Sequence, residues 1–253
     1  MSFQKIFANQ HNQIIGGQVI INDPSDVQHL SKVLRISVGD NLVIGDQEGT
    51  DYLLVIEQIN KQDIKAKIIK KYQVTKESKV QLYLLQGLAK GEKMDWIVQK
   101  SVELGVAKIF PLQLERCIIK VEEKKEQAKT ARWQKIAAEA AAQSQRNYIP
   151  EVMRPQTLKE VLQSMPNITW LVAFEEDDSQ GLTACLQEIR AAKTEKIGIV
   201  IGPEGGLALS EVQLIEAYGG KSISLGKRIL RTETAAITAL SILQFTLGDI
   251  GGE

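Results

Sequence analysis

The sequence predicts an α/β protein: a small N-terminal β-barrel at residues 1–73 and a larger α/β domain with a mostly parallel sheet at residues 74–253. In the first part, short β-branched runs with turn signals surround one helical pattern, which is typical of small barrels. In the second part, apolar strand-sized runs alternate with helical patterns, as in α/β domains. Between them Val74–Lys79 is polar and has no apolar period, so we place the boundary there.

The N-terminal domain is expected to hold several short strands and one helix. β-branched runs between Asp-Pro, Gly-Asp and Glu-Gly turns predict the strands Val19–Ile21, Asn41–Ile44, Tyr52–Ile59 and Ile64–Ile69. Between the first two, Asp26–Arg35 puts its apolar residues on one face at helical spacing, so we expect a helix there.

The C-terminal domain is expected to alternate strands with helices. The predicted strands are Val80–Leu85, Ala107–Leu112, Trp170–Phe174, Ile197–Ile201 and Ser222–Leu225. The predicted helices are Glu92–Leu104, Glu123–Gln145, Leu158–Met165, Leu182–Ala192, Glu211–Tyr218 and Glu233–Leu247. Ser210-x-x-Gln213 is a capping-box pattern, and Thr232 is the expected N-cap of the last helix. That helix carries one charge, Glu233, so it must be covered in the domain interior or at a subunit interface.

Composition excludes several classes of protein. The chain has 253 residues, 43% of them hydrophobic, and its 31 basic residues balance 31 acidic ones, so global charge does not indicate a nucleic-acid binder. Cys117 and Cys185 lie far apart and the chain has two histidines, which argues against a zinc site and excludes a disulfide framework. The longest apolar runs are strand-sized and the N-terminus has no signal-peptide pattern. We expect a cytoplasmic protein with no membrane segment and no metal.

Two glycine-punctuated loops follow predicted strands and open into predicted helices: Gly202–Gly206 (GPEGG) and Leu225–Ala235 (LGKRILRTETA). Glycine allows a backbone to approach a ligand closely, and helix N-termini offer free N–H groups, so the pair predicts a backbone-lined pocket. A P-loop is excluded, because five residues separate Gly220 from Gly226 and Arg228 follows the lysine. No G-x-G-x-x-G fingerprint follows any predicted strand. GPEGG alone is more often a plain turn, but the ordered second loop favours a binding site.

IGPEGG followed by LGxRILRTETA resembles the signature of the SPOUT superfamily of S-adenosylmethionine-dependent RNA methyltransferases, and within it the 16S ribosomal RNA uridine-N3 methyltransferases. The resemblance covers nearly the whole chain in order, through HLSKVLR at 29–35, KMDWIVQKSVELGV at 93–106, ER at 115–116 and AAEAAAQSQRNYIP at 137–150. It implies a PUA-like RNA-binding barrel, an α/β domain with a deep trefoil knot, and a homodimer through the knotted domain. The implied substrate is a decoding-region uridine of 16S rRNA in the small ribosomal subunit.

The resemblance also assigns a cofactor site for S-adenosylmethionine. Its residues are Gly202, Pro203, Glu204, Gly205, Gly206, Leu225, Gly226, Ile229, Leu230 and Ala235, completed by Leu171 and Phe174 from the preceding strand. Backbone amides are expected to bind the adenine and ribose, with Ile229 and Leu230 on either side of the purine. The sulfonium activates its own methyl group, so the chemistry needs no metal.

Two residues of the second loop are candidates for catalysis. Uridine N3 is a poor nucleophile until its proton is removed, and the resulting charge spreads to the base oxygens. Arg231, beside a helix N-terminus, is the main candidate for stabilising that charge. Glu233 either acts in the chemistry, holds Arg231, or simply favours the first helical turn as an acidic residue. The general base is left open, and solvent is one candidate.

Contacts to RNA are expected from both domains. The candidates are His29, Lys32, Arg35, Arg116, Gln143, Arg146 and Asn147, with Tyr148 stacking on a base. Against this, a lone histidine is more often a surface or packing residue, and an arginine at a helix end also suits the helix dipole. The lysines at 61, 65, 67, 70 and 71 fit either an RNA-contacting strand face or a solubilising edge strand, and we favour the edge.

The sequence departs from the family pattern in the barrel. Gln4-Lys5 stands where an arginine is usual, and Gln28 replaces a common second histidine before His29. Lysine keeps the charge of arginine but loses its bidentate fork. The departures concern RNA contacts, not methyl transfer.

Two alternative functions remain open. One is a knotted methyltransferase that acts on a ribose 2′-hydroxyl, against which the barrel and the full-length resemblance argue. The other is a non-catalytic RNA-binding assembly factor, against which the intact loops argue.

Overall fold

The computed structural model describes residues 3–9, 12–73, 75–120, 123–174 and 181–251. Val74, the first residue of the predicted boundary segment, lies outside the described residues. The chain divides into two compact units, Met1–Glu77 with Ala141–Ile149, and Ser78–Ala140 with Pro150–Glu253. The segment Ala141–Ile149 therefore belongs with the barrel, although the sequence places it within the predicted C-terminal domain.

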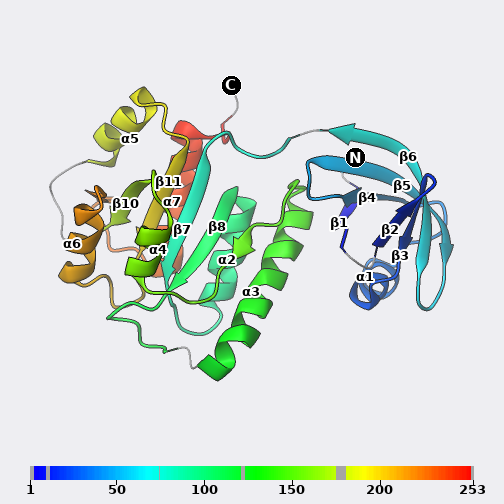
Figure 1. Cartoon of the computed structure of the whole chain (residues 1–253), viewed down its shortest axis with the longest axis horizontal. Helices are drawn as coiled ribbons and strands as arrows, with labels where there is room; N and C mark the ends of the chain where they lie inside the picture. The colour runs from blue at the N-terminus through cyan, green and yellow to red at the C-terminus, as the bar shows by residue number, and fades with distance from the viewer. Residues whose placement is uncertain (1–2, 10–11, 74, 121–122, 175–180, 252–253) are drawn as a thin grey trace. The chain divides into compact units, whose positions relative to one another are not determined.

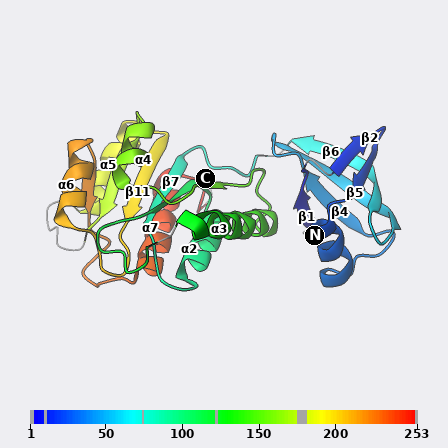
Figure 2. The ribbon, with the colours of Figure 1, turned by 60° about the horizontal axis from the view of Figure 1, so that its bottom comes forward.

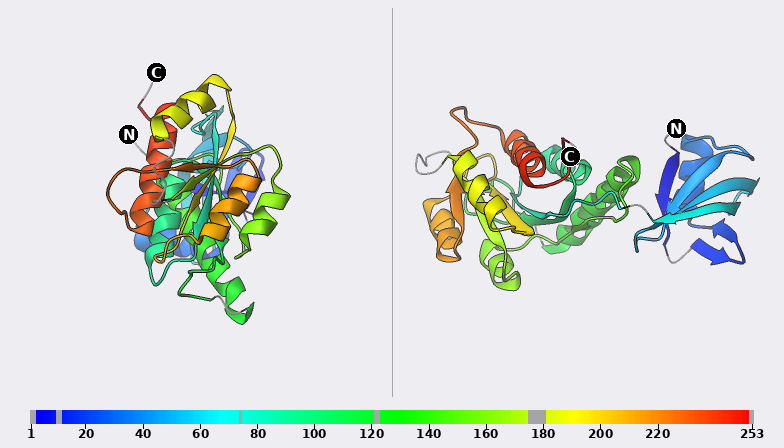
Figure 3. Two further views of the ribbon diagram at one scale, coloured as in Figure 1. Left: turned by 90° about the vertical axis from the view of Figure 1, so that its left-hand side faces the viewer. Right: turned by 90° about the horizontal axis from the view of Figure 1, so that it is seen from above.

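The first unit contains one curled six-stranded sheet in the order β1-β4-β5-β6-β3-β2 (Figure 1; Figure 3). Its strands are β1 Gln4–Phe7, β2 Asn12–Ile15, β3 Gln18–Ile21, β4 Asn41–Gly45, β5 Thr50–Ile59 and β6 Ile64–Gln73. β1 pairs in parallel with β4, and the other neighbours are antiparallel. Alternate residues such as Ile21, Leu42, Leu54 and Ile64 form the core. β1 and β2 were not predicted, because both are short and mix polar with apolar residues without alternation.

Two expectations for this unit are corrected, the first of them in part. β6 lies between β5 and β3, but β3 pairs only with Ile64–Lys67, so Lys65 and Lys67 are not at a sheet edge, whereas Lys70 and Lys71 lie beyond the pairing with β3. The predicted helix is two pieces, α1 Pro24–Gln28 and a π-helical turn, His29–Val33. Asp23 caps α1 by accepting hydrogen bonds from the Ser25 and Asp26 amides. The π-helical turn ends at Val33, and two residues later Arg35 has a left-handed φ of 51°, which does not allow the helix to continue.

The second unit contains a parallel sheet in the order β12-β10-β11-β7-β8-β9 (Figure 1). Its strands are β7 Gln81–Gly87, β8 Val106–Leu112, β9 Glu151–Val152, β10 Thr169–Ala173, β11 Lys196–Ile201 and β12 Lys221–Ile223. Its helices are α2 Lys93–Glu103, α3 Glu123–Gln143, α4 Leu158–Ser164, α5 Leu182–Ala191, α6 Leu209–Ala217 and α7 Thr232–Leu247. The predicted elements are all present with small shifts at their ends. β9 was missed because it has two residues.

The last helix returns from an edge of the sheet to its middle. β12 is the edge strand, yet α7 packs against α2, β7 and β11 (Figure 2). Ala236, Ala239, Leu240 and Leu243 are buried along its inner face, and Phe245 is 70% exposed. Small residues on that face allow this close approach to the sheet and to α2. The trefoil knot itself stays a prediction.

The predicted caps of α6 and α7 are corrected. α6 begins at Leu209, and the Glu211 carboxylate, rather than Ser210 and Gln213, accepts a hydrogen bond from the Ala208 amide at 2.9 Å. α7 begins at Thr232 itself, with Arg231 in the cap position. The Thr232 hydroxyl makes tertiary hydrogen bonds instead of capping the helix.

Candidate functional site: a pocket built by two glycine loops

The two glycine loops meet at the carboxyl edge of the parallel sheet. β10 pairs with β11 and β12 in the same direction, so the segments that follow them emerge at one edge. They enclose a pocket of about 380 Å³, within the usual range for small-molecule sites. Its lining residues are Lys93, Arg116, Ala173, Phe174, Ile201–Leu207, Ser224–Gly226, Arg228–Thr232 and Ala235.

Glycines give the first loop its shape. A Cβ on Gly202 would lie 2.9 Å from the Gly206 carbonyl carbon, and Gly206 has a left-handed φ of 72°. Both positions therefore require glycine for this turn to close. A Cβ on Gly87, at the end of β7, would lie 2.6 Å from Pro203, so the absence of a side chain there lets the loop rest against the strand.

Thr232 joins the two loops. Its hydroxyl donates to the Gly202 carbonyl at 2.6 Å and accepts from Gln86 Nε2 at 2.9 Å. Gln86 is fully buried and Thr232 is 6% exposed. The start of α7 is thereby fixed to the first loop and to β7.

The second loop leaves its main chain free. Within the described part of the chain, the backbone N–H and C=O groups of Lys227–Leu230 make no hydrogen bond with the protein. Gly226 has a φ of 120°, which few other residues adopt. The Ile229 side chain is 83% exposed. Unused polar groups beside an uncovered apolar side chain suit a ligand with both polar and apolar faces.

Charged side chains surround the pocket and are mostly cationic. The lining includes Lys93, Arg116, Arg228 and Arg231, against a single carboxylate, Glu204. Glu204 Oε1 accepts hydrogen bonds from the Lys90 amide at 2.9 Å and from Lys93 Nζ at 3.0 Å. Burial opposes the charged form of Glu204, but these hydrogen bonds outweigh it and hold its pKa below the usual value. Glu204 is therefore a poor proton acceptor at neutral pH.

Most of the predicted cofactor residues line this pocket, and so does Arg231. Leu171 does not: it is fully buried inside β10, because only the end of that strand reaches the pocket. Glu233 does not line it either, and its Oε2 lies 3.9 Å from Lys93 Nζ. Lys93, Arg228 and Thr232 were missed as lining residues, although a lysine on the first turn of a helix was a usable signal.

The predicted RNA contacts differ in exposure. His29, Lys32, Arg35, Gln143 and Tyr148 are exposed, and Arg116 lies at the pocket with Nη1 3.4 Å from the Gly205 carbonyl.

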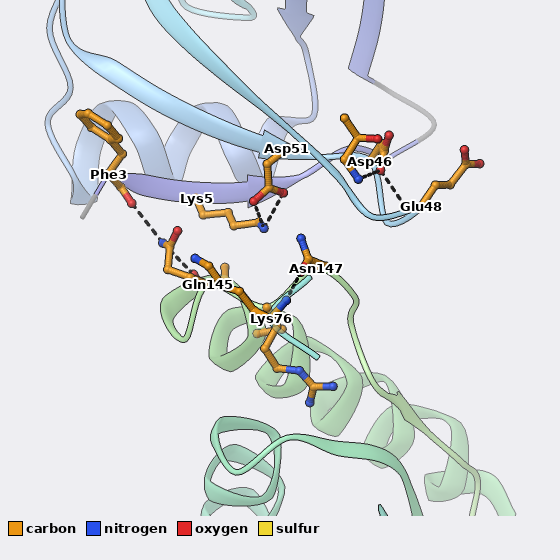
Figure 4. Close-up of polar contacts among 12 residues, drawn as sticks. Phe3, Lys5, Asp46, Glu48, Asp51, Lys76, Gln145 and Asn147 are labelled. Carbon is orange, nitrogen blue, oxygen red and sulfur yellow. Dashed lines mark hydrogen bonds and ion pairs between the residues drawn. The ribbon is translucent and has the colours of Figure 1, made fainter. Parts of the chain in front are cut away.

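Arg146 and Asn147, by contrast, are 6% and 1% exposed. The Arg146 guanidinium pairs with Glu77, and Asn147 Oδ1 accepts from the Lys76 amide at 2.7 Å. Figure 4 shows Asn147 turned toward Lys76, while Gln145 reaches the Phe3 carbonyl. Arg146 and Asn147 are therefore engaged in contacts within the first unit, and a contact of either residue with RNA stays a prediction.

Lys5 also has a structural place. Its side chain is fully buried, and Nζ donates to both carboxylate oxygens of Asp51 at 2.7 and 2.8 Å (Figure 4). Burial lowers the pKa of Lys5, with Asp51 acting in the opposite direction. The lysine that stands near the usual arginine of the family pattern is therefore part of a buried ion pair of the barrel.

Neither a membrane span nor a metal centre is found in the part of the chain that the structure describes. Its helices are too short or too polar to cross a bilayer. Among those same residues, histidine, cysteine and acidic side chains nowhere gather in a group of three that would hold a metal ion.

Comparisons with known proteins match both units. An RNA methyltransferase domain matches residues 76–244, and an RNA methyltransferase PUA domain matches residues 21–69. The ribosomal RNA small subunit methyltransferase E of Bacillus subtilis is 36% identical over 223 residues, 87% of each chain.

Solved structures agree with the sequence matches. The ribosomal RNA small subunit methyltransferase E of Neisseria gonorrhoeae, bound to S-adenosylmethionine, is 32% identical with a TM-score of 0.85, covering 98% of this chain and 100% of that one. A methyltransferase of Legionella pneumophila, solved with its bound cofactor SAM, has the same identity and TM-score, covering 99% of this chain and 100% of that one.

Proposed function

The chain belongs to the ribosomal RNA small subunit methyltransferase E family, and from this we propose that it methylates N3 of a decoding-region uridine in 16S rRNA with S-adenosylmethionine as the methyl donor. The observation that carries the proposal is the pocket between the glycine loops, with the unused main chain of Lys227–Leu230 on one wall. Two relatives in the same fold were solved with this cofactor.

The residues present fit S-adenosylmethionine. Its adenine needs an apolar surface and main-chain hydrogen bonds, which Ile229, Leu230 and the free backbone groups beside them supply. Gly202, Gly205 and Gly206 let the opposite wall come close to the ribose and methionine parts. Bound there, the cofactor supplies an activated methyl group on its sulfonium. The pocket's own part is to orient that methyl group toward the base.

Arg231 is the proposed electrostatic catalyst. It lies at the N-cap of α7 and lines the pocket, and within the described residues its guanidinium has no hydrogen-bond or ion-pair partner. A free guanidinium beside a helix N-terminus favours negative charge on a base oxygen as N3 loses its proton. Glu233 pairs loosely with Lys93, so we propose that it acts by holding that neighbour and not by contacting the base.

The barrel is the proposed RNA-binding domain. His29 and Lys32 are exposed on the π-helical turn and Arg35 is exposed just after it, and such turns recur at functional sites. In the second unit, Arg116 at the pocket is a separate proposed RNA contact. With 16S rRNA as the substrate, the proposed location is the cytoplasm.

A homodimer through the second unit is proposed as well. The support is α7, whose sequence is nearly uncharged and which leaves Phe245 70% exposed. A self-complementary contact through this helix would cover that ring.

Mass mapping of small-subunit rRNA from a strain that lacks this gene tests the function. The proposal requires that one methylated uracil disappear and return when the gene is restored. Loss of a ribose methylation would instead favour the 2′-hydroxyl enzyme. An unchanged map together with no binding of S-adenosylmethionine would favour the non-catalytic assembly factor.

A further inference from the structure

Lys93 occupies a position that its own helix does not favour. It is the first residue of α2, where the helix dipole presents positive charge and a cation is destabilising. The preceding residue, Glu92, makes no side-chain cap, and Asp95 in the same turn pairs with Arg132. The reason for a lysine at this site therefore lies outside α2.

The Lys93 ammonium joins three segments that build the pocket. It donates to Glu204 of the first glycine loop at 3.0 Å and lies 3.9 Å from Glu233 in the first turn of α7. The same Glu204 oxygen accepts from the Lys90 amide at 2.9 Å, so the segment after β7 is fixed as well. One nitrogen thus connects α2, the first loop and the element that the second loop enters.

The charges make this connection dependent on Lys93. The Glu204 carboxylate lies 3.0 Å and the Glu233 carboxylate 3.9 Å from the same ammonium, so removal of Lys93 would take a cation away from both. Glu233 Oε2 is buried and has no hydrogen-bond partner within the described part of the chain, so Lys93 is the cation that compensates it. The Lys93 side chain is 35% exposed and lines the pocket, so its removal would change the charge and the shape of the pocket.

We propose that Lys93 is a positioning residue that holds the two glycine loops at the spacing S-adenosylmethionine binding requires. The inference rests on the proposed function, because it takes the cofactor as the ligand of the pocket. Glycine-rich loops are costly to order, and a contact that orders them beforehand raises affinity for the ligand. Lys93 acts through Glu204 and Glu233 and need not touch the cofactor.

This role predicts a specific kinetic pattern. Without the ammonium the cofactor must itself order the loops, so the KM for S-adenosylmethionine rises while kcat at saturating cofactor changes little. A merely structural role would reduce the fraction of folded enzyme, which lowers kcat and leaves KM unchanged.

The test is calorimetric titration of the full chain with S-adenosylmethionine, followed by the same comparison in steady-state kinetics. Lys93→Met is expected to weaken binding about tenfold, in line with the loss of a charged hydrogen bond. Lys93→Arg keeps the charge and is expected to restore most of the affinity. Lys100→Met is the matched control: Lys100 lies on the same helix, is 33% exposed, and pairs with Glu103 away from the pocket.

Glu204→Gln is a second variant, which keeps the side-chain shape but removes one of the charges that Lys93 holds. It is expected to weaken binding in the same direction, and it tests the inference if Lys93→Met fails to fold. If the wild-type chain binds S-adenosylmethionine and the folded Lys93→Met and Glu204→Gln variants bind it equally tightly, the proposed role of Lys93 is wrong. The proposed function is then unaffected. Equal losses for the Met and Arg variants would overturn the role of Lys93 too. Failure of the wild-type chain to bind would overturn the proposed function, and this inference with it.

Discussion

At the scale of single residues, the charged groups of the pocket have two different roles, one structural and one proposed to be catalytic. Glu204 is held ionised by hydrogen bonds and serves structure, whereas Arg231 is exposed and unpaired within the described residues. The other charged residues of the lining are all lysine or arginine. A pocket of this kind attracts negative charge, as expected where a base is to lose a proton.

Arg231→Ala tests this separation. We expect the affinity for S-adenosylmethionine to stay within about threefold, because the main chain holds the cofactor. Turnover should fall by about 10²-fold or more, the usual loss for a group that stabilises developing charge. Single-turnover methylation of rRNA, alongside calorimetry, measures both. An unchanged rate would remove Arg231 from the mechanism.

Gly205→Val tests the loop wall. The φ of Gly205 is compatible with any residue, so the fold should be retained, but a Cβ there would lie 3.0 Å from both the Cβ and the carbonyl oxygen of Arg116. A branched side chain must therefore push the loop or Arg116 aside, and we expect cofactor binding to be lost. Calorimetry with a thermal melt measures this. Gly181→Val is the control, because Gly181 has open space around a Cβ and an ordinary φ, and it should bind the cofactor as the wild-type chain does. Gly219→Val would not serve, because the φ of Gly219 is 80°.

At the scale of elements, the pattern of apolar residues predicted the strands and helices well but did not predict the tertiary contacts between them. Apolar runs located β7, β8, β10 and β11, because buried parallel strands are continuously hydrophobic. Thr232 shows the limit: its spacing fits an N-cap, but its hydroxyl bonds Gly202 and Gln86, residues distant in sequence. The burial of Leu171 and the ion pair of Arg146 were not predicted for a similar reason, since neither pattern nor motif reveals which face of an element is buried.

Thr232→Val tests the joint between loops. The methyl group replaces the hydroxyl at nearly constant volume, which leaves the Gly202 carbonyl and Gln86 amide without this partner. We expect a loss of about 2 kcal/mol, or a melting temperature lower by about 4–8 °C. Thr234→Val, the same change at an exposed position of α7, should have little effect on the melt. Equal melting temperatures for the two variants would contradict the role given to Thr232.

At the scale of the whole molecule, the segment Ala141–Ile149 belongs to the barrel unit through buried polar contacts. Arg146→Met should destabilise that unit by about 3 kcal/mol, because it leaves Glu77 without its buried partner. Protection of barrel amides in hydrogen exchange measures the change. If Arg146 instead served RNA binding, the variant would lose RNA affinity while exchange stayed the same.

The proposed dimer gives the last prediction. Phe245 is 70% exposed on a helix whose one charged residue is Glu233, so a buried position in an assembly is the simplest account of its exposure. Phe245→Glu should convert a dimer to a monomer in light scattering, because a carboxylate cannot be buried without a partner. Val38→Glu changes an equally exposed residue of the barrel, at 64%, and should leave the mass unchanged. A wild-type chain that is monomeric at all concentrations would end the dimer proposal, and with it the reason for an uncharged α7 surface.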